Sequence, residues 1–284
     1  MKNFNGKRSR HKLLRVAALF VLACAALVAD SNYRIVTTEY TLTYAGLPRS
    51  FDGLRIVQLS DLHGMSFGED NARLVKKVSG LEPDLIFLTG DFIDREEDIE
   101  TTVTLCRQLT ALAPVYFCSG NHDWGSGLAW ELMEALEDCG VKWLHNDYDE
   151  VMLGGESILI AGVEDPNSLA EMEQPDELAR RINEERPGKF IVLLGHRNYW
   201  PEEYPDLPVD LIFSGHGHGG VVRLPGGAGL LGTEHNFFPE YDAGVFESGR
   251  YSMVVSRGLG GNGVLPIPRF LNNPEVVCVT LKCS

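Results

Sequence analysis

Three short apolar runs in the first half of the chain are each followed by a stretch whose apolar residues recur with helical spacing. The apolar runs, which are typical of buried strands, cover residues 54–60, 84–89 and 114–119. The amphipathic stretches, which predict helices, cover residues 69–79, 98–112 and 128–138. Gly140 follows the last of them and suits a helix C-terminus. Repeated strand–loop–helix units predict parallel α/β packing.

Apolar runs follow one another more closely in the second half, where the pattern is richer in strands. Candidate strands cover residues 150–153, 157–163, 190–194, 211–213, 221–224, 252–255 and 276–281, with one helix at 175–184. A further strand or hairpin is predicted at residues 34–44. Two sheets must face each other if both halves bury their apolar strands. Because no Ser/Pro-rich linker divides the halves, we predict one domain over residues 33–284.

The N-terminal segment joins a basic cluster to an apolar run. Six Lys and Arg side chains and no acid fall within the first fifteen residues, and residues 16–29 are uncharged. A spanning helix needs about 20 apolar residues and a signal-peptide core about 7–15, so a cleaved signal stays open as the alternative. The poor fit of a small-x-small cleavage site favours an anchor over residues 13–32. Residues 1–12 are then a basic cytoplasmic tail, and the body lies outside the cytoplasm.

The charge balance narrows the choice of partners. The chain carries 25 Lys and Arg against 40 Asp and Glu, a net charge of −15. Because six of the cations lie in the basic cluster, the remaining 269 residues carry a net charge of −21. A body with this excess of acidic residues lacks the cations that neutralise the phosphates of a nucleic acid, so no nucleic-acid binding is expected. Attraction for an anionic substrate must then be local.

Polar residues with metal-binding chemistry follow five of the predicted strands. Ligands of α/β sheets bind beyond the carboxyl ends of strands, so these side chains are expected to converge. Neighbouring glycines let the backbone turn sharply there. Five of the eight histidines fall in these motifs, which makes chance placement a poor explanation. The motifs are Asp61-Leu62-His63, Gly90-Asp91, Gly120-Asn121-His122-Asp123, Gly195-His196 and Gly215-His216-Gly217-His218.

The residue types in these motifs predict divalent metal ions. Imidazole, carboxylate and amide ligands without a thiolate suit Mn, Fe or Zn. Seven ligands are too many for one zinc ion and suit two ions about 3.5–4 Å apart, with Asp91 as the shared carboxylate. The two predicted ligand sets are Asp61, His63, Asp91 and His218 for one ion, and Asp91, Asn121, His196 and His216 for the other.

In order and spacing, these motifs resemble those of the calcineurin-like metallophosphoesterases, whose pattern is D-x-H, GD, GNH[DE], a Gly- or Ala-preceded His, and GHxH. The resemblance covers residues 54–220 directly. It implies a four-layer α/β/β/α sandwich, of α/β (α+β) class, with two facing mixed sheets. The N-terminal apolar segment adds a transmembrane helix to this fold.

A closer resemblance is to the membrane-linked bacterial branch, which includes phosphodiesterases and UDP-2,3-diacylglucosamine pyrophosphatases. The N-terminal segment, residues 58–63 and the tail at 256–263 and 268–270 carry this likeness. That branch often has Gln after GHTHGG, whereas this chain has Gly217 in place of Thr and Val221 in place of Gln. The finer substrate assignment therefore stays open.

The resemblance also implies a mechanism, in which a hydroxide bridging the two ions attacks phosphorus in line with the leaving oxygen. His122 is expected to stabilise charge on the phosphoryl oxygens or to protonate the leaving group. Asp123 is expected to orient His122. Arg257 and Asn262, in glycine-rich tail loops, are candidate substrate-binding residues, although a surface role fits them equally well.

The predicted function is therefore hydrolysis of a phosphodiester or pyrophosphate bond, with a phosphoester or lipid phosphate as substrate. The protein is expected in a bacterial cell membrane as a single-pass protein with its catalytic domain outside the cytoplasm. Two other functions stay open, a metal-binding scaffold at the membrane without turnover and a hydrolase with a single ion. The pattern specifies neither the oligomeric state nor the native metal.

Overall fold

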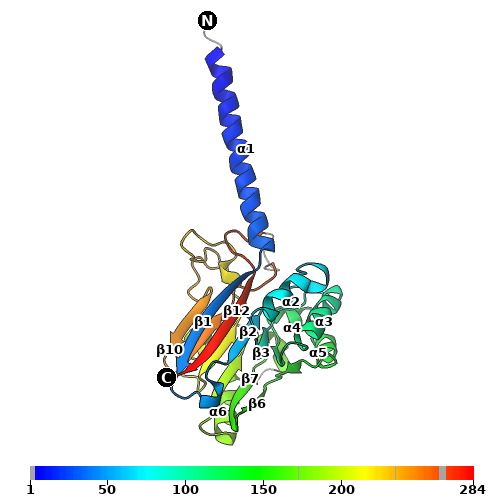
Figure 1. The fold of residues 1–284 in the computed structure, drawn as a ribbon, viewed down its shortest axis with the longest axis vertical. Coiled ribbons are helices and arrows are strands. Elements are labelled where there is room, and N and C mark those ends of the chain that lie inside the picture. Colours follow the sequence, from blue (N-terminus) through cyan, green and yellow to red (C-terminus); the bar gives the residue numbers. More distant parts are fainter. Residues whose placement is uncertain (1–3, 172, 234, 262–266) are drawn as a thin grey trace.

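The computed structural model describes residues 4–171, 173–233, 235–261 and 267–284. A long helix, α1 (Phe4–Tyr33), projects from the body at the N-terminal end (Figure 1). Within it, His11–Tyr33 is long and apolar enough to cross a membrane, judged by length and composition, and its apolar part is not buried against the body. Its 23 residues extend about 35 Å at 1.5 Å per residue, against a hydrocarbon core of about 30 Å.

The body is built on two six-stranded sheets, here called sheet A and sheet B. The strand order of sheet A is β1-β12-β2-β3-β4-β5, and that of sheet B is β10-β11-β9-β8-β7-β6. The strands of sheet A are β1 (Val36–Tyr44), β2 (Arg55–Leu59), β3 (Leu85–Thr89), β4 (Val115–Cys118), β5 (Lys142–Trp143) and β12 (Glu275–Cys283). Those of sheet B are β6 (Asp147–Leu153), β7 (Glu156–Gly162), β8 (Phe190–Leu194), β9 (Leu211–Ser214), β10 (Gly244–Ser248) and β11 (Tyr251–Val255).

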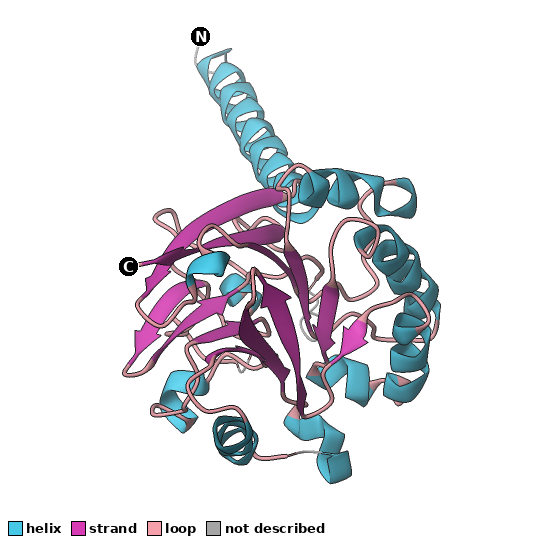
Figure 2. Ribbon diagram, turned by 60° about the horizontal axis from the view of Figure 1, so that its bottom comes forward, coloured by secondary structure: helices cyan, strands magenta, loops and turns pink. Residues whose placement is uncertain are grey.

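Helices cover the outer faces of the two sheets (Figure 2). The larger ones are α2 (Ala72–Ser79), α3 (Glu97–Leu109) and α5 (Ala129–Glu137) on sheet A, and α6 (Pro175–Glu185) on sheet B. The short ones are α4 (Asn121–Gly125) and α7 (Trp200–Glu203). Short 3-10 segments are η1 (Arg49–Phe51), η2 (Glu69–Asn71), η3 (Pro166–Glu171) and η4 (His218–Gly220).

The central strands are buried on both faces, which explains their continuous apolar runs. Alternate residues of β2 show this, because Val57 packs under the helices of sheet A while Ile56 faces sheet B. Side chains from both sheets interdigitate around Phe87 and Phe213, whose rings are 5.1 Å apart in an edge-to-face contact. A third apolar cluster lies between sheet B and α6. The predicted order of helix, sheet, sheet and helix is confirmed.

The local predictions differ from the structure mainly at edges and turns. Residues 221–224 were expected to form a strand, but they make only isolated bridges, such as Val222 to Phe270. The backbone turns just before them, because Gly220 and Val221 have φ values of 69° and 42°, outside the extended region. β5, of two residues, and the partly exposed edge strand β10 carry too weak an apolar pattern to have been predicted.

Strand directions place the foot of α1 and the predicted metal ligands at the same edge of sheet A. β2, β3 and β4 run parallel, so their carboxyl ends meet at one edge. β12 pairs antiparallel with β2 and parallel with β1, so β1 begins at that same edge. Because α1 leads into β1, the long helix rises from the end of the body at which the strand-end motifs lie (Figure 1).

Candidate metal centre

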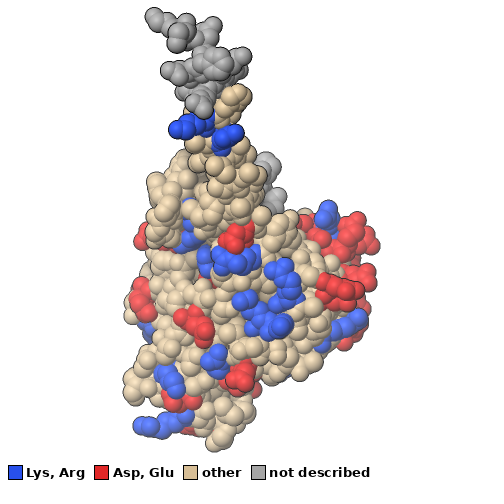
Figure 3. Space-filling model, turned by 45° about the horizontal axis from the view of Figure 1, so that its top comes forward, with Lys and Arg blue, Asp and Glu red and all other residues tan. Residues whose placement is uncertain are grey.

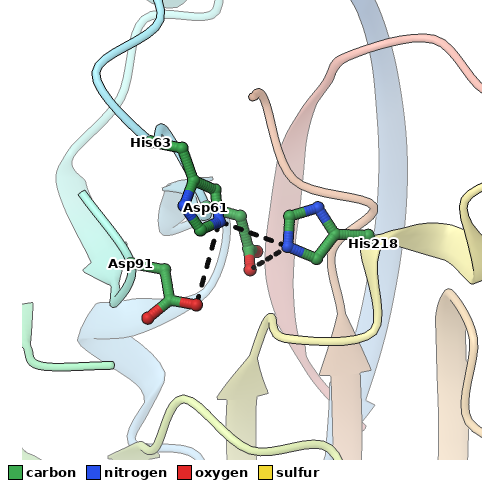
Figure 4. A group of neighbouring side chains, drawn as sticks. All are labelled: Asp61, His63, Asp91 and His218. Carbon is green, nitrogen blue, oxygen red and sulfur yellow. Dashed lines mark hydrogen bonds and ion pairs between the residues drawn. The ribbon is translucent and has the colours of Figure 1, made fainter. Parts of the chain in front are cut away.

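The predicted ligands converge into two overlapping groups that share Asp91. Within each group the possible ligand atoms lie within 4.8 Å of one another. The first group is Asp61, His63, Asp91 and His218, which Figure 4 shows with their polar ends turned toward one another. The second group is Asp91, His196 and His216. Apart from Asn121, these are the two ligand sets predicted from the sequence.

Short contacts between the side chains define the centre. His218 Nε2 lies 3.2 Å from Asp61 Oδ1 and 3.3 Å from His63 Nε2. Asp91 Oδ2 lies 3.0 Å from His196 Nε2 and 3.8 Å from His63 Nε2. One carboxylate oxygen therefore faces a histidine from each group, which is the position required of a bridging ligand.

Two buried acceptors in the centre have no hydrogen-bond partner among the described residues. They are Asp61 Oδ2 and Asn121 Oδ1. A buried polar atom without a partner costs about 1–3 kcal/mol, and more if it is charged. The acceptors lie among imidazoles and a second carboxylate, a donor set that suits a divalent cation. The residues therefore fit the metal ions that the motifs predict.

Five of the predicted ligands hold left-handed backbone conformations that are rare outside glycine. Their φ values lie between 47° and 63°, and they are Asp61, His63, Asp91, His216 and His218. Each such residue costs of the order of 1–3 kcal/mol, and such strain is concentrated at functional sites. Close packing adds a second constraint, since a Cβ on Gly120 would fall on the Asp91 carboxylate and one on Gly215 would meet Ser60. The motif glycines are therefore required sterically.

The local electrostatics differ between the two groups. Burial works against a charged imidazole at His196, but the Asp91 carboxylate outweighs it and raises the pKa of His196 to about 10. At His218 burial prevails over Asp61, and the pKa of His218 falls to about 4. His196 Nδ1 donates to the carbonyl of Thr89 at 2.8 Å, which leaves Nε2 to face Asp91, in the orientation that a metal ligand would need.

Asp94 joins the centre, although the sequence reasoning did not single it out. Its Oδ1 lies 2.7 Å from His122 Nδ1 and 3.0 Å from His63 Nδ1. Because a carboxylate only accepts, both Nδ1 atoms carry the hydrogen, and both Nε2 atoms face away from Asp94. Burial disfavours the charge of Asp94, but the hydrogen bonds from the two histidines outweigh it and hold the pKa of Asp94 below its usual range. The sequence signal for this role of Asp94 is its position three residues after Asp91, in the same loop that follows β3.

The role expected of Asp123 needs correction. Its carboxylate was expected to orient His122, but it accepts the backbone N–H groups of Asp91, Phe92, Ile93 and Gly120 at 2.8–3.1 Å. Burial and the nearby charge of Asp91 raise the pKa of Asp123 to about 7, against the effect of these hydrogen bonds. Asp123 therefore ties the loop after β3 to the start of α4, and Asp94 is the carboxylate on His122.

Of the two candidate substrate-binding residues, Arg257 does not join the ligand groups. The Arg257 guanidinium pairs with Glu275 Oε1 at 2.7 Å. Asn262 lies outside the described residues. Two other arginines approach the ligands instead, with Arg269 Nη2 3.3 Å from His218 Nδ1 and Arg197 Nη1 3.2 Å from His216 Nε2.

Comparison with known proteins assigns the family. The family model described as calcineurin-like phosphoesterase matches residues 54–220, more than half of the chain. The chain belongs to this family. The family and the clustered ligands together make the protein a metal-dependent phosphohydrolase that uses divalent metal ions.

Relatives in several organisms are similar over nearly the whole chain. The uncharacterised metallophosphoesterase YkuE of Bacillus subtilis is 32% identical over 294 residues, covering 98% of this chain and 99% of its own length. The UDP-2,3-diacylglucosamine pyrophosphatase LpxG of Chlamydia muridarum is 28% identical and covers 84% of this chain and 86% of its own length. A Danio rerio protein described as a transmembrane protein with a metallophosphoesterase domain is 28% identical over 96% of this chain and 63% of its own length. Together with α1, the transmembrane relative supports an association with membranes.

Proposed function

We propose that the protein is a membrane-anchored phosphohydrolase with two divalent ions, which cleaves a phosphodiester or pyrophosphate bond of a lipid or lipid-linked substrate. The observation that carries the proposal is the pair of ligand groups that share Asp91. In each group the possible ligand atoms lie within 4.8 Å of one another. Mn, Fe and Zn all suit the nitrogen and oxygen donors. The similarity to a pyrophosphatase whose substrate carries acyl chains supports a lipid-linked substrate.

The proposed ligands fall into the two sets that share Asp91. Asp61, His63, Asp91 and His218 would hold one ion, and Asp91, Asn121, His196 and His216 the other. When bound, the two ions supply Lewis acidity, which lowers the pKa of water and neutralises charge on a phosphoryl group. The Thr89 carbonyl and the Asp94 carboxylate orient the rings of His196 and His63 for this purpose.

His122 is the proposed catalytic acid, held by Asp94. The hydrogen bond from Nδ1 to Asp94 fixes the ring and stabilises its positive charge, while Nε2 is left to donate a proton to the leaving oxygen. Backbone contacts hold this residue beside the metal ligands, because its N–H donates to Asp91 Oδ1 at 2.8 Å. A proton delivered to the leaving oxygen neutralises the negative charge that would otherwise develop on the departing group.

Two hollows beside the ligand groups support a substrate with two substituents on phosphorus. One, of about 400 Å³, is lined by Asp94, Asn121 and His122. The other, of about 330 Å³, is lined by His216 and by Tyr199 and Tyr241 among others. A phosphodiester or pyrophosphate centred on the ligands extends in both directions, whereas a phosphate monoester extends in one.

α1 is proposed as the membrane anchor, with the catalytic domain outside the cytoplasm. The 23-residue length of His11–Tyr33 supports the span, and the basic residues at its N-terminal end support the orientation. Protease protection of intact cells tests it, because an extracytoplasmic body is digested from outside without lysis. Protection of the body until lysis would reverse the orientation and place the substrate on the cytoplasmic leaflet.

Activity and metal content test the chemistry. We expect the purified full-length chain to hydrolyse bis-p-nitrophenyl phosphate when loaded with Mn²⁺, and Asp91→Ala to lose both metal ions and all turnover. Asp138→Asn, an exposed carboxylate far from the ligand groups, is the matched control. A protein that binds two ions without turnover would support the metal-binding scaffold instead. A protein that binds one ion and keeps full turnover would support a mononuclear hydrolase.

A further inference from the structure

The foot of α1 is hydrogen-bonded to the loop that supports one of the predicted ligands. The Asn32 side chain donates to the carbonyl of Arg269 at 3.0 Å and accepts its N–H at 3.2 Å. The Asn273 side chain donates to the carbonyl of Asp30 at 2.7 Å. Since the buried guanidinium of Arg269 reaches His218, a single residue separates the foot of the helix from the metal centre. The centre is therefore held close to the surface of any membrane that α1 crosses.

Four exposed apolar side chains stand on loops at this same end of the body. They are Leu224, Phe237, Phe238 and Ile267, here called the apolar rim, with exposed fractions of 39%, 71%, 59% and 41%. Backbone bridges join Val222 to Phe270, next to Arg269, and Leu231 to Phe237. Figure 1 shows these loops, coloured yellow to orange-red, beside the foot of α1.

The backbone at Phe238 presents two aromatic rings to solvent together. Successive side chains of an extended segment point to opposite faces, so one of two neighbouring rings would ordinarily turn inward. Phe238 has a φ of 54°, a conformation that is unusual for a bulky residue and breaks this alternation. Exposed apolar groups clustered in this way mark contact surfaces for proteins or membranes.

The charges around the foot of α1 suit a lipid surface. The body is acidic overall, yet Arg73 donates to the carbonyl of Tyr33 at 2.9 Å and Lys77 donates to Thr37 at 3.3 Å. On the face shown in Figure 3, Lys and Arg gather below the foot of the helix, while many of the Asp and Glu lie along one flank. Cations at this height favour anionic headgroups.

We propose that the apolar rim enters the headgroup layer of the membrane that α1 crosses, so that the metal centre takes its phosphoester from that layer. The inference rests on the proposed function, because α1 must be a membrane anchor. The lipid surface is chosen over a protein partner because the rim continues the contact that α1 itself makes with the bilayer. Aromatic and aliphatic side chains of interfacial segments bury about 5–10 Å into the headgroup and acyl boundary.

Fluorescence quenching by brominated lipids tests the placement of the rim. The full-length chain is reconstituted into vesicles of phosphatidylethanolamine and phosphatidylglycerol, with bromine on the acyl chains near the headgroups. Phe238→Trp and Leu224→Trp each add a tryptophan to one loop of the rim. Met152→Trp is the matched control, because Met152 is 61% exposed at the tip of the β6–β7 hairpin, at the end of the body away from α1 (Figure 1).

We expect brominated lipid to quench the added emission of both rim variants and to leave that of Met152→Trp unchanged. Equal quenching in all three variants, or none in the two rim variants, would overturn the inference. If the added tryptophans of the rim are shielded from acrylamide but not quenched by brominated lipid, the rim contacts protein. That result would also overturn the inference.

Two further measurements test the proposed function independently of the position of the apolar rim. Resistance of the reconstituted chain to alkaline extraction reports the anchor, and Mn²⁺-dependent hydrolysis of soluble bis-p-nitrophenyl phosphate reports the chemistry. An anchored and active chain with an unquenched rim overturns this inference alone. An inactive chain with a quenched rim overturns the chemistry alone.

Discussion

Replacing Asp94 by Asn tests whether this carboxylate acts through His122. The Asp94 oxygen is 2.7 Å from His122 Nδ1, and the substitution keeps the shape of the side chain while removing its charge. A hydrogen bond to a charged group is worth about 1.5–3 kcal/mol. If that stabilisation of the protonated ring is lost in the transition state, kcat falls roughly 10- to 150-fold, at 1.36 kcal/mol per factor of ten. Removing His122 altogether should cost about 10²–10⁴.

The assay is a double-mutant cycle at saturating Mn²⁺, with metal content measured for each protein. Saturation is necessary because Asp94 also holds His63 Nδ1, at 3.0 Å, and its loss should weaken metal binding as well. Because Asp94 is proposed to act through His122, Asp94→Asn should add almost nothing to His122→Ala. The loss should also be larger for an alkyl leaving group than for nitrophenoxide, which departs without a proton.

Two results would refute this reasoning. One is a pair of losses that multiply in the double variant, which would mean that the two side chains act independently. The other is an Asp94→Asn protein that keeps the wild-type kcat with both leaving groups. Asp138→Asn serves again as the control for a change of surface charge.

Three further predictions concern stability and metal binding. Arg269→Gln removes charged hydrogen bonds to buried carbonyls and the contact with His218, and should lower the free energy of unfolding by about 1.5–3 kcal/mol in urea titrations and weaken metal binding. Asp91 raises the pKa of His196 to about 10, so the ring is protonated in the metal-free protein below that pH and must release a proton to bind metal. The affinity for Mn²⁺, measured by calorimetry, should therefore rise about tenfold per pH unit between roughly pH 6 and 8. Phe87→Ala, between the sheets, should cost about 3–5 kcal/mol in the same titrations.

Each of these predictions has a contrary result. An Arg269→Gln protein with unchanged stability and metal affinity would show that the buried guanidinium does not support His218. A metal affinity that is flat with pH would mean that His196 is already neutral in the metal-free centre. Phe237→Ala is the control for Phe87→Ala, since a 71% exposed ring should change the unfolding free energy by less than about 0.5 kcal/mol.

The convergence of the predicted ligands followed from the sequence because its signals are local. Each predicted ligand comes directly after an apolar run, and strands of a parallel sheet end at a common edge. The glycines beside Asp91 and His216 were visible in the sequence, and the structure shows why a larger residue would clash there. Binary pattern and strand-end chemistry therefore determined the fold class and the convergence of the motifs.

Only the tertiary structure decided which carboxylate serves His122. Asp94 and Asp123 both follow strand ends, and Asp123 is the neighbour in sequence. The turn after β3 directs Asp94 back onto the ring, while α4 aims Asp123 at the backbone of the facing loop. Such a choice depends on φ and ψ angles over a few residues, which residue types alone do not specify.

The position of the metal centre relative to α1 was also beyond the sequence. It depends on β12 inserting between β1 and β2, parallel to one and antiparallel to the other, a pairing between the two ends of the chain. Long-range strand pairing leaves no local signature, because many registers bury the same apolar residues. The sequence by itself determined which side chains gather as candidate metal ligands, and the pairing of the terminal strands decided that they gather at the foot of α1.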